Sequence, residues 1–186
     1  MTPQRKDAAR NWDRIVAVAR ELVDEGTPLQ LNDVARRAEL GVGTVYRHFP
    51  TPEALLETVA LPHFETLATH GEQALHHEDP WQALTGYLTR LVEVQVGDPA
   101  VAKVSAGHTD VLPRTTELRK HLIDIGTTLL HRARDAGTAR GDIADDDLVP
   151  LMCGISYASY VHSDNATDRL AAARRYLDTL LRGLHT

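Results

Sequence analysis

The chain has almost no cysteine: Cys153 is the only one among its 186 residues. An intramolecular disulfide is therefore impossible, and a zinc site of several thiolates is excluded, which fits a reducing compartment. Long apolar runs are missing too, so we expect no segment to span a bilayer. Residues 1–6, MTPQRK, lack the apolar stretch of a signal peptide. These absences predict a cytoplasmic protein with no membrane partner.

The usual catalytic and cofactor-binding motifs are also missing. No His-Glu-x-x-His, Gly-x-Ser-x-Gly, Walker-type or dinucleotide-binding loop occurs. The histidines and glutamates of residues 70–78 lack the pattern of a bundle di-metal site. They fall partly in a predicted interhelix loop, so we interpret them as solvated surface. We therefore expect no enzymatic activity, no metal and no cofactor.

An excess of positive charge is the third absence, because the net charge is −6. This value first argues against nucleic acid, but the charge is unevenly distributed. Residues 1–60 carry eight basic and nine acidic side chains, and the rest of the chain carries twelve and seventeen. Within the first fourteen residues, basic side chains outnumber acidic ones by two. This distribution is compatible with an N-terminal part that faces DNA.

Apolar residues recur at helical spacing almost throughout, and no period-two run is long enough for a sheet. Thr51, Asp79 and Asp98 each precede a proline, which predicts a helix N-terminus because these residues cap helices and proline suits the first position. Gly26 is expected to end the first helix. The pattern predicts an all-α fold of about nine helices, with short ones near residues 31–38 and 44–49 and the last two near 146–161 and 167–184.

Two prolines fall inside predicted helices. Pro62 lies in a helix expected to run from residue 52 to about residue 70, and it should kink that helix because it lacks an N–H and its ring crowds the preceding turn. Pro150 lies near the start of the penultimate helix, where it marks either a late start or a bend.

Three helices in the first 50 residues, the last two short and joined by a glycine-containing turn, are typical of a helix-turn-helix. Ala35 and Ala38 allow the helices to approach closely. The last helix then presents Thr44 and Arg47, with Tyr46 and His48 beside them. A recognition helix places such residues in the major groove, where arginine reads guanine. We expect the DNA-contacting set to be Asn32, Val42, Gly43, Thr44, Tyr46, Arg47 and His48.

Residues 33–49, DVARRAELGVGTVYRHF, resemble the TetR-family signature D-I-A-x-x-A-G-V-S-x-G-T-L-Y-x-H-F, and the match extends over roughly residues 10–60. The resemblance implies a DNA-binding domain at residues 1–50 and a helical domain at residues 51–186 that binds a small molecule and forms a homodimer through the last two helices. The expected partners are a near-palindromic double-stranded operator and an effector, and the expected function is ligand-responsive repression.

Three departures from the signature remove features that other members have. Glu39 stands where the family has glycine, Gly41 replaces a serine, and Pro52 replaces a basic residue. The last two changes remove phosphate contacts, so we expect few ionic contacts and a modest dependence on salt. Arg5, Lys6 and Arg10 can compensate as an N-terminal arm, or they belong to a solvated tail.

The effector cavity is expected between the helices that begin at residues 80, 99 and 113, because such sites are mostly apolar with few polar groups. The candidate cavity residues are Leu84, Tyr87, Leu88, Leu91, Gln95, Val104, His108, His121 and Ile125.

Two other interpretations of the function stay open: a TetR-like fold that acts through protein partners alone, and a small helical enzyme.

Overall fold

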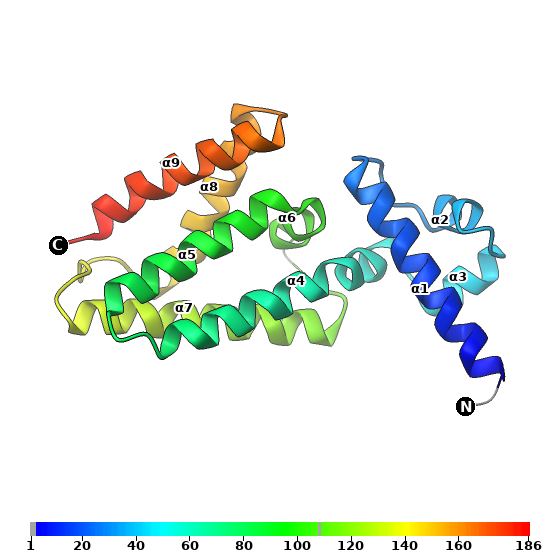
Figure 1. Ribbon diagram of the computed structural model, residues 1–186, viewed down its shortest axis with the longest axis horizontal. Helices are drawn as coiled ribbons and strands as arrows, with labels where there is room; N and C mark the ends of the chain where they lie inside the picture. The colour runs from blue at the N-terminus through cyan, green and yellow to red at the C-terminus, as the bar shows by residue number, and fades with distance from the viewer. Residues whose placement is uncertain (1–2, 108) are drawn as a thin grey trace.

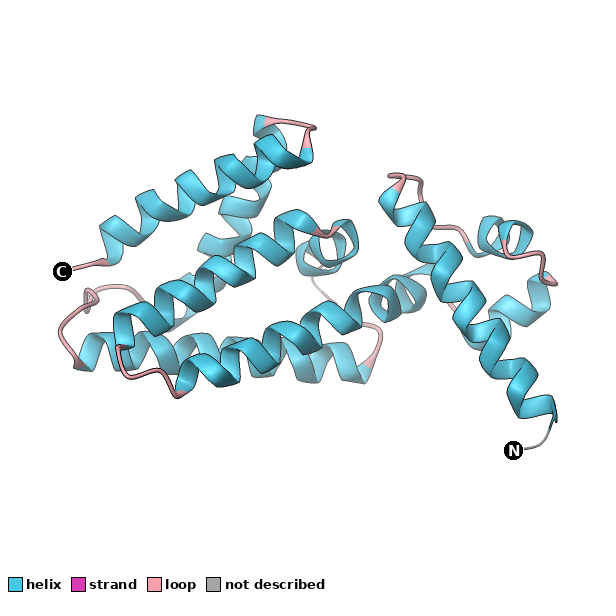
Figure 2. Ribbon diagram, in the orientation of Figure 1, coloured by secondary structure: helices cyan, strands magenta, loops and turns pink. Residues whose placement is uncertain are grey.

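The computed structural model describes residues 3–107 and 109–186. This part of the chain is helical apart from its connections (Figure 2), which confirms the expected all-α fold with nine α-helices. The helices are α1 (Pro3–Asp24), α2 (Leu31–Arg37), α3 (Val42–His48), α4 (Pro52–Leu75), α5 (Pro80–Gly97), α6 (Pro99–Ala106), α7 (Pro113–Asp135), α8 (Leu148–His162) and α9 (Ala166–Leu184).

Helices α1 to α3 form a head at one end of the molecule, and α4 leads from the head into the body (Figure 1). There α4 lies beside α5 and α7, while α8 and α9 pack on the other side of α5. Helix α6 is short and fits between the head and the body, in contact with both α1 and α4. The molecule therefore has two routes from head to body, one along α4 and one through α6.

The head is held together by small and branched apolar residues. Ala35 and Ala38 are fully buried, so α2 approaches α1 and α3 closely. Val45 of α3 is buried in the same core. On the rim, Trp12 of α1 lies against Phe49, with 6.3 Å between ring centroids. This core fixes α3 on the side of α1 that faces away from the body (Figure 1).

The predicted N-terminal caps and the predicted end of the first helix are confirmed. Thr51 Oγ1 accepts a hydrogen bond from Ala54 N at 3.1 Å, and Asp79 caps α5 in the same way through Trp81 N. Gly26 has φ of +72° and follows the end of α1, a left-handed conformation that glycine adopts at no steric cost.

Several helices differ from their expected extent, and α3 begins at Val42 rather than at residue 44. Helix α1 begins at Pro3, so Lys6 and Arg10 lie on a helix rather than in a tail, and Arg10 pairs with Asp7. Helix α4 continues through Pro62 to Leu75, beyond the expected end near residue 70. A 3-10 turn at 145–147 precedes α8, so Pro150 is the third residue of a helix that starts late. The N–H that proline lacks has no intrahelical partner at this position.

The body is packed around Tyr87, which is 2% exposed. Its hydroxyl donates to the Leu122 carbonyl at 2.7 Å and ties α5 to α7, and its burial raises the pKa of the phenol. Gly71 of α4 is required here, because a Cβ at this position would lie 2.9 Å from the Tyr87 ring. At the far end of α5, Trp81 makes an edge contact with His185, with ring centroids 4.6 Å apart.

Candidate functional site

The turn between α2 and α3 carries an unusual backbone conformation. Glu39 has φ of +51°, the one left-handed non-glycine residue in the described chain. Side chains rarely adopt this region because Cβ crowds the backbone. Glu39 lies where the sequence departs from a glycine, and its carboxylate pairs with Arg14 of α1 at 2.9 Å. The turn thus keeps its shape without the residue that usually allows it.

The outer face of α3 exposes side chains suited to nucleic acid. Tyr46 and Val42 are each 47% exposed, and Arg47 is exposed beside them. The Arg47 guanidinium is held by the Gly43 carbonyl at 3.0 Å and by Thr44 Oγ1 at 3.2 Å. These exposed bonds are readily exchanged for contacts with a ligand.

The other residues expected on this surface are less uniform. Asn32 is exposed on α2, while His48 is half-buried, with its ring 6.4 Å from that of Phe49. Gly43 is exposed, and a Cβ added there meets no atom within 4 Å. The fold itself therefore does not require glycine at residue 43.

Most arginines of the head are already paired with acids. Arg37 binds Glu25, and Arg36 binds Asp33 at 2.7 Å. The Arg37 guanidinium lowers the pKa of Glu25 mainly through their hydrogen bond. Among the head cations whose side chains are described, Lys6 and Arg47 make no ion pair. The head therefore offers few free positive charges.

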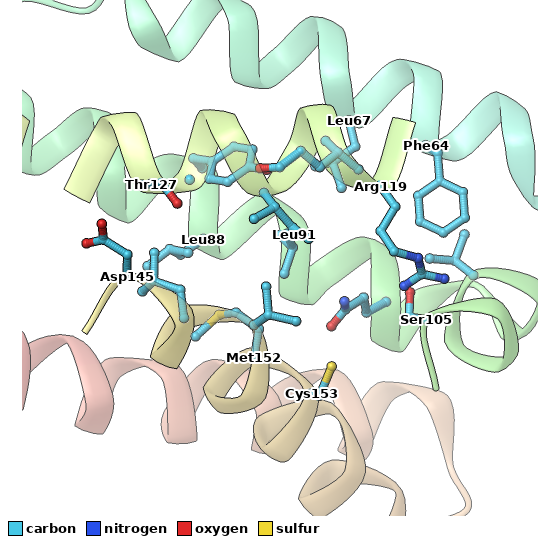
Figure 3. Close-up of a pocket in the computed structure, with 18 residues that line it drawn as sticks. Phe64, Leu67, Leu88, Leu91, Ser105, Arg119, Thr127, Asp145, Met152 and Cys153 are labelled. Atoms are coloured by element: carbon cyan, nitrogen blue, oxygen red, sulfur yellow. The ribbon is translucent and has the colours of Figure 1, made fainter. Parts of the chain in front are cut away.

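A cavity of about 90 Å³ lies in the body among α4, α5, α6, α7 and α8. Its walls are mostly apolar. Figure 3 shows Leu88, Leu91 and Met152 along its length, with Phe64 and Leu67 toward one end. Arg119 and Ser105 lie at that end, and Asp145 and Thr127 lie at the other (Figure 3). Ile123 and Val149 line the cavity and are 40% and 42% exposed, so its mouth opens between α7 and α8.

Both charged groups of the cavity wall have partners. The Arg119 guanidinium binds Asp110 at 2.8 Å and the Val104 carbonyl at 3.0 Å, and the bond to Asp110 raises the Arg119 pKa. Asp145 pairs with Arg134 and with His131, both at 2.8 Å. These bonds lower the pKa of Asp145, with Arg134 the larger cause.

Four of the residues expected at an effector site line this cavity: Tyr87, Leu88, Leu91 and Gln95. The others do not. Leu84, Val104 and Ile125 are buried in the core outside it, and His121 lies in a surface groove where it pairs with Glu72 at 3.0 Å. His108 lies outside the described residues.

Sequence reasoning missed Arg119, Met152 and Cys153, which line the cavity from α7 and α8. Arg119 follows Leu118 directly. Its position as a charged residue beside the apolar stripe of its helix is a sequence signal that could have identified it as a cavity residue. Helix α8 is apolar on all sides. The periodicity of its sequence therefore does not distinguish the face toward the cavity from the outer face.

Two carboxylates join the body to its neighbouring elements. Glu57 of α4 is 3% exposed and accepts from the backbone N–H groups of Val111 and Leu112 at 2.6 and 2.8 Å, just before α7. Asp98 caps α6 through Ala100 N. The same Asp98 carboxylate binds Arg20 of α1 at 2.8 Å. Arg20 also donates to the Val59 carbonyl on α4, so it links the head to both routes.

An apolar face of α8 has no partner among the residues that the structure describes. Tyr157 and Val161 are 74% and 70% exposed, and Gly154, one turn earlier, has open space beside it. Among all helices of the described residues, α8 included, none has the length and apolarity needed to cross a bilayer. No cluster of three potential metal ligands occurs among those residues either.

Family models match two parts of the chain. Residues 15–59 match bacterial regulatory proteins of the tetR family, and residues 79–186 match the C-terminal domain described as transcriptional regulator SbtR-like. A curated HTH-type transcriptional regulator of Staphylococcus aureus is 28% identical over 108 residues. That alignment covers 56% of this chain and 58% of the relative.

Solved structures extend the likeness to the whole fold. A TetR transcriptional regulator from Streptomyces coelicolor is 30% identical, with 93% of this chain and 97% of that chain covered and a TM-score of 0.58. A TetR regulatory protein from Mycobacterium vanbaalenii is 27% identical, with 99% and 100% covered and a TM-score of 0.53. FadR from Bacillus subtilis, solved with stearoyl-CoA, shares the fold at 18% identity and a TM-score of 0.68, with 94% and 100% covered.

Proposed function

Because the chain belongs to the TetR family of bacterial transcriptional regulators, we propose that it represses transcription as a homodimer on a near-palindromic operator and that a small molecule releases it. The observation that carries this proposal is the outer face of α3. Thr44, Tyr46 and Arg47 belong to α3, the second helix of a helix-turn-helix, and α3 lies on the side of α1 that faces away from the body (Figure 1).

Each side chain of this face suits a different contact. Arg47 can bind the O6 and N7 atoms of a guanine, and the Thr44 methyl can meet a thymine methyl. Tyr46 and His48 suit phosphate oxygens, which position the protein without reading sequence. Asn32, Val42 and Gly43 complete the proposed contact set, with Gly43 at a point of close approach to the DNA backbone.

The unpartnered face of α8 supports a homodimer through the last two helices. Gly154, Tyr157 and Val161 recur at helical spacing, and the two larger side chains are mostly exposed. A two-fold interface buries the same face of both copies. The two recognition helices would then lie about 34–36 Å apart, in successive major grooves.

Release of the operator requires that the effector favour one arrangement of the heads over another. Val101 of α6 lines the cavity, and Asp98 at the start of the same helix binds Arg20 of the head. We propose that an effector displaces α6 and that the Asp98–Arg20 pair passes this movement to α1. Helix α4 provides the second route. A coupling of about 1–3 kcal/mol is sufficient.

The test is binding of the purified full chain to the DNA upstream of its own gene, measured by fluorescence anisotropy over a salt series. Lys6 and Arg47 are the cations without an ion pair among the described side chains of each head. Counting these two, we expect a log–log salt slope of about −4 for the dimer. Arg47→Ala should weaken binding by about 1–3 kcal/mol and relax specificity at one base pair. Arg90→Ala, on the exposed surface of the body, is the matched control and should leave affinity unchanged.

Three results contradict the proposal. No binding at low salt would favour action through a protein partner, and turnover of a substrate would favour an enzyme. A monomer in gel filtration at micromolar concentration would exclude the dimer.

A further inference from the structure

We infer that the cavity selects an electrically neutral, mainly apolar molecule with one polar group that both donates and accepts a hydrogen bond, as an alcohol does. This inference rests on the proposed function, because it names the chemistry of the effector. It stands on the charge pairing around Arg119, on the unpartnered side-chain oxygen of Gln95 and on the apolar walls of the cavity.

The walls require an apolar molecule. The cavity is lined by leucine, valine and aromatic side chains from α4 to α8. At the mouth, Ile123 and Val149 keep 40% and 42% of their surface in water. A ligand that covers them removes this apolar area from water, which contributes about 25 cal/mol for each Å². A strongly hydrated ligand gains none of this contribution.

The charges disfavour an ionic molecule. Arg119 is already paired with Asp110 at 2.8 Å. A carboxylate that approaches Arg119 therefore meets a guanidinium that already holds a carboxylate. At the other end, an ammonium group that approaches Asp145 meets a carboxylate that already pairs with Arg134 and His131. An ion that leaves water without a free counter-charge pays a large desolvation penalty.

The unfilled hydrogen-bonding groups define the polar part. Gln95 Oε1 is buried and has no partner among the described residues. Arg119 uses Nε and Nη2 for Asp110 and Val104, while Nη1 makes no hydrogen bond there. Toward the Arg119 end the cavity wall thus carries an unfilled acceptor and an unfilled donor, and the Ser105 hydroxyl lies at the same end. A hydroxyl group matches both, since it donates one hydrogen bond and accepts others.

The experiment is isothermal titration calorimetry of the full-length protein, without DNA, against probes that differ only in their head group. The probes are 1-alkanols of four to ten carbons and the carboxylates and amines of equal chain length, at pH 7. We expect the best alkanol to bind at least tenfold more tightly than the carboxylate and the amine of its length. Equal or tighter binding of either ion overturns the inference, as does an absence of binding by all three classes.

Two variants test the residues themselves. Asp110→Asn frees the Arg119 charge, so carboxylate affinity should rise at least tenfold while alkanol affinity stays within threefold. Gln95→Leu removes the free acceptor and should weaken alkanol binding about five- to tenfold, the value of one hydrogen bond. Asp135→Asn, on the exposed end of α7, is the matched control for net charge and should change neither affinity. A purely structural role for Asp110 predicts that both affinities fall together, which overturns the assignment.

Failure of this inference is distinguishable from failure of the proposed function. If the protein binds no DNA but keeps its preference for alkanols, the inference about the cavity stands and the operator proposal fails. If the protein binds its operator and only charged probes enter the cavity or release the DNA, the inference alone is overturned.

Discussion

At the scale of single residues, Glu39 holds an unfavourable backbone conformation that lowers the stability of the head. Its φ of +51° is unfavourable for a side chain with a Cβ, and its carboxylate gains only an exposed ion pair with Arg14. Exposed pairs contribute little to stability. Glu39→Gly should therefore raise the free energy of unfolding by about 1 kcal/mol in urea denaturation. Glu39→Ala, which loses the ion pair but keeps the Cβ, should not stabilise the protein; an equal gain in both variants would assign the effect to charge.

At Gly43, the same substitution is expected to raise the stability of the protein and to weaken its binding to DNA. The space beside it is open and its backbone is helical, so alanine fits and should stabilise α3 by about 0.5–1 kcal/mol. If Gly43 approaches a DNA backbone as proposed, the added methyl should weaken operator binding at the same time. Unfolding and anisotropy measurements on Gly43→Ala test both effects, and unchanged DNA affinity would remove Gly43 from the contact set.

At the scale of elements, the buried Glu57 carboxylate anchors the start of α7 to α4. Glu57→Ala leaves the N–H groups of Val111 and Leu112 without their acceptor, so it should cost about 2–3 kcal/mol of unfolding free energy. Glu57→Gln retains one acceptor and should cost about half as much. Glu65→Ala, which removes an exposed partner of Arg114 on the same helix, should change stability by less than about 0.5 kcal/mol. Equal losses for residues 57 and 65 would contradict the anchor.

The elements are also where sequence reasoning is strongest, because helix ends depend on local chemistry. The Thr-Pro and Asp-Pro pairs predicted the starts of α4, α5 and α6 correctly. The passage of α4 through Pro62 was also predicted, but the end of this helix was placed near residue 70, whereas α4 runs to Leu75. The cavity is harder still. Tyr87 and Gln95 were identifiable on their own helix, but Arg119 and Cys153 reach the same space from helices that are distant in sequence.

For the whole molecule, the Asp98–Arg20 pair makes head and body interdependent. Asp98→Asn keeps a capping side chain for α6 but weakens the ion pair, which is mostly buried and contributes about 1–2 kcal/mol. Amide hydrogen exchange in α1 to α3 should then accelerate about tenfold, while exchange in α5 and α7 stays unchanged. Asp79→Asn is the matched control, because Asp79 also caps a helix before a proline but contacts no part of the head. Uniform acceleration across the chain would contradict a specific head–body link.

The two tryptophans give this molecule a spectroscopic property of its own. The sequence has only two, and they lie in different parts: Trp12 rests on Phe49 at the rim of the head, and Trp81 rests on His185 at the far end of the body. Single-tryptophan variants with phenylalanine at the other position therefore provide one intrinsic emitter for each part. The emission of Trp12 reports on DNA engagement beside α3, and that of Trp81 reports on the body, without any attached dye.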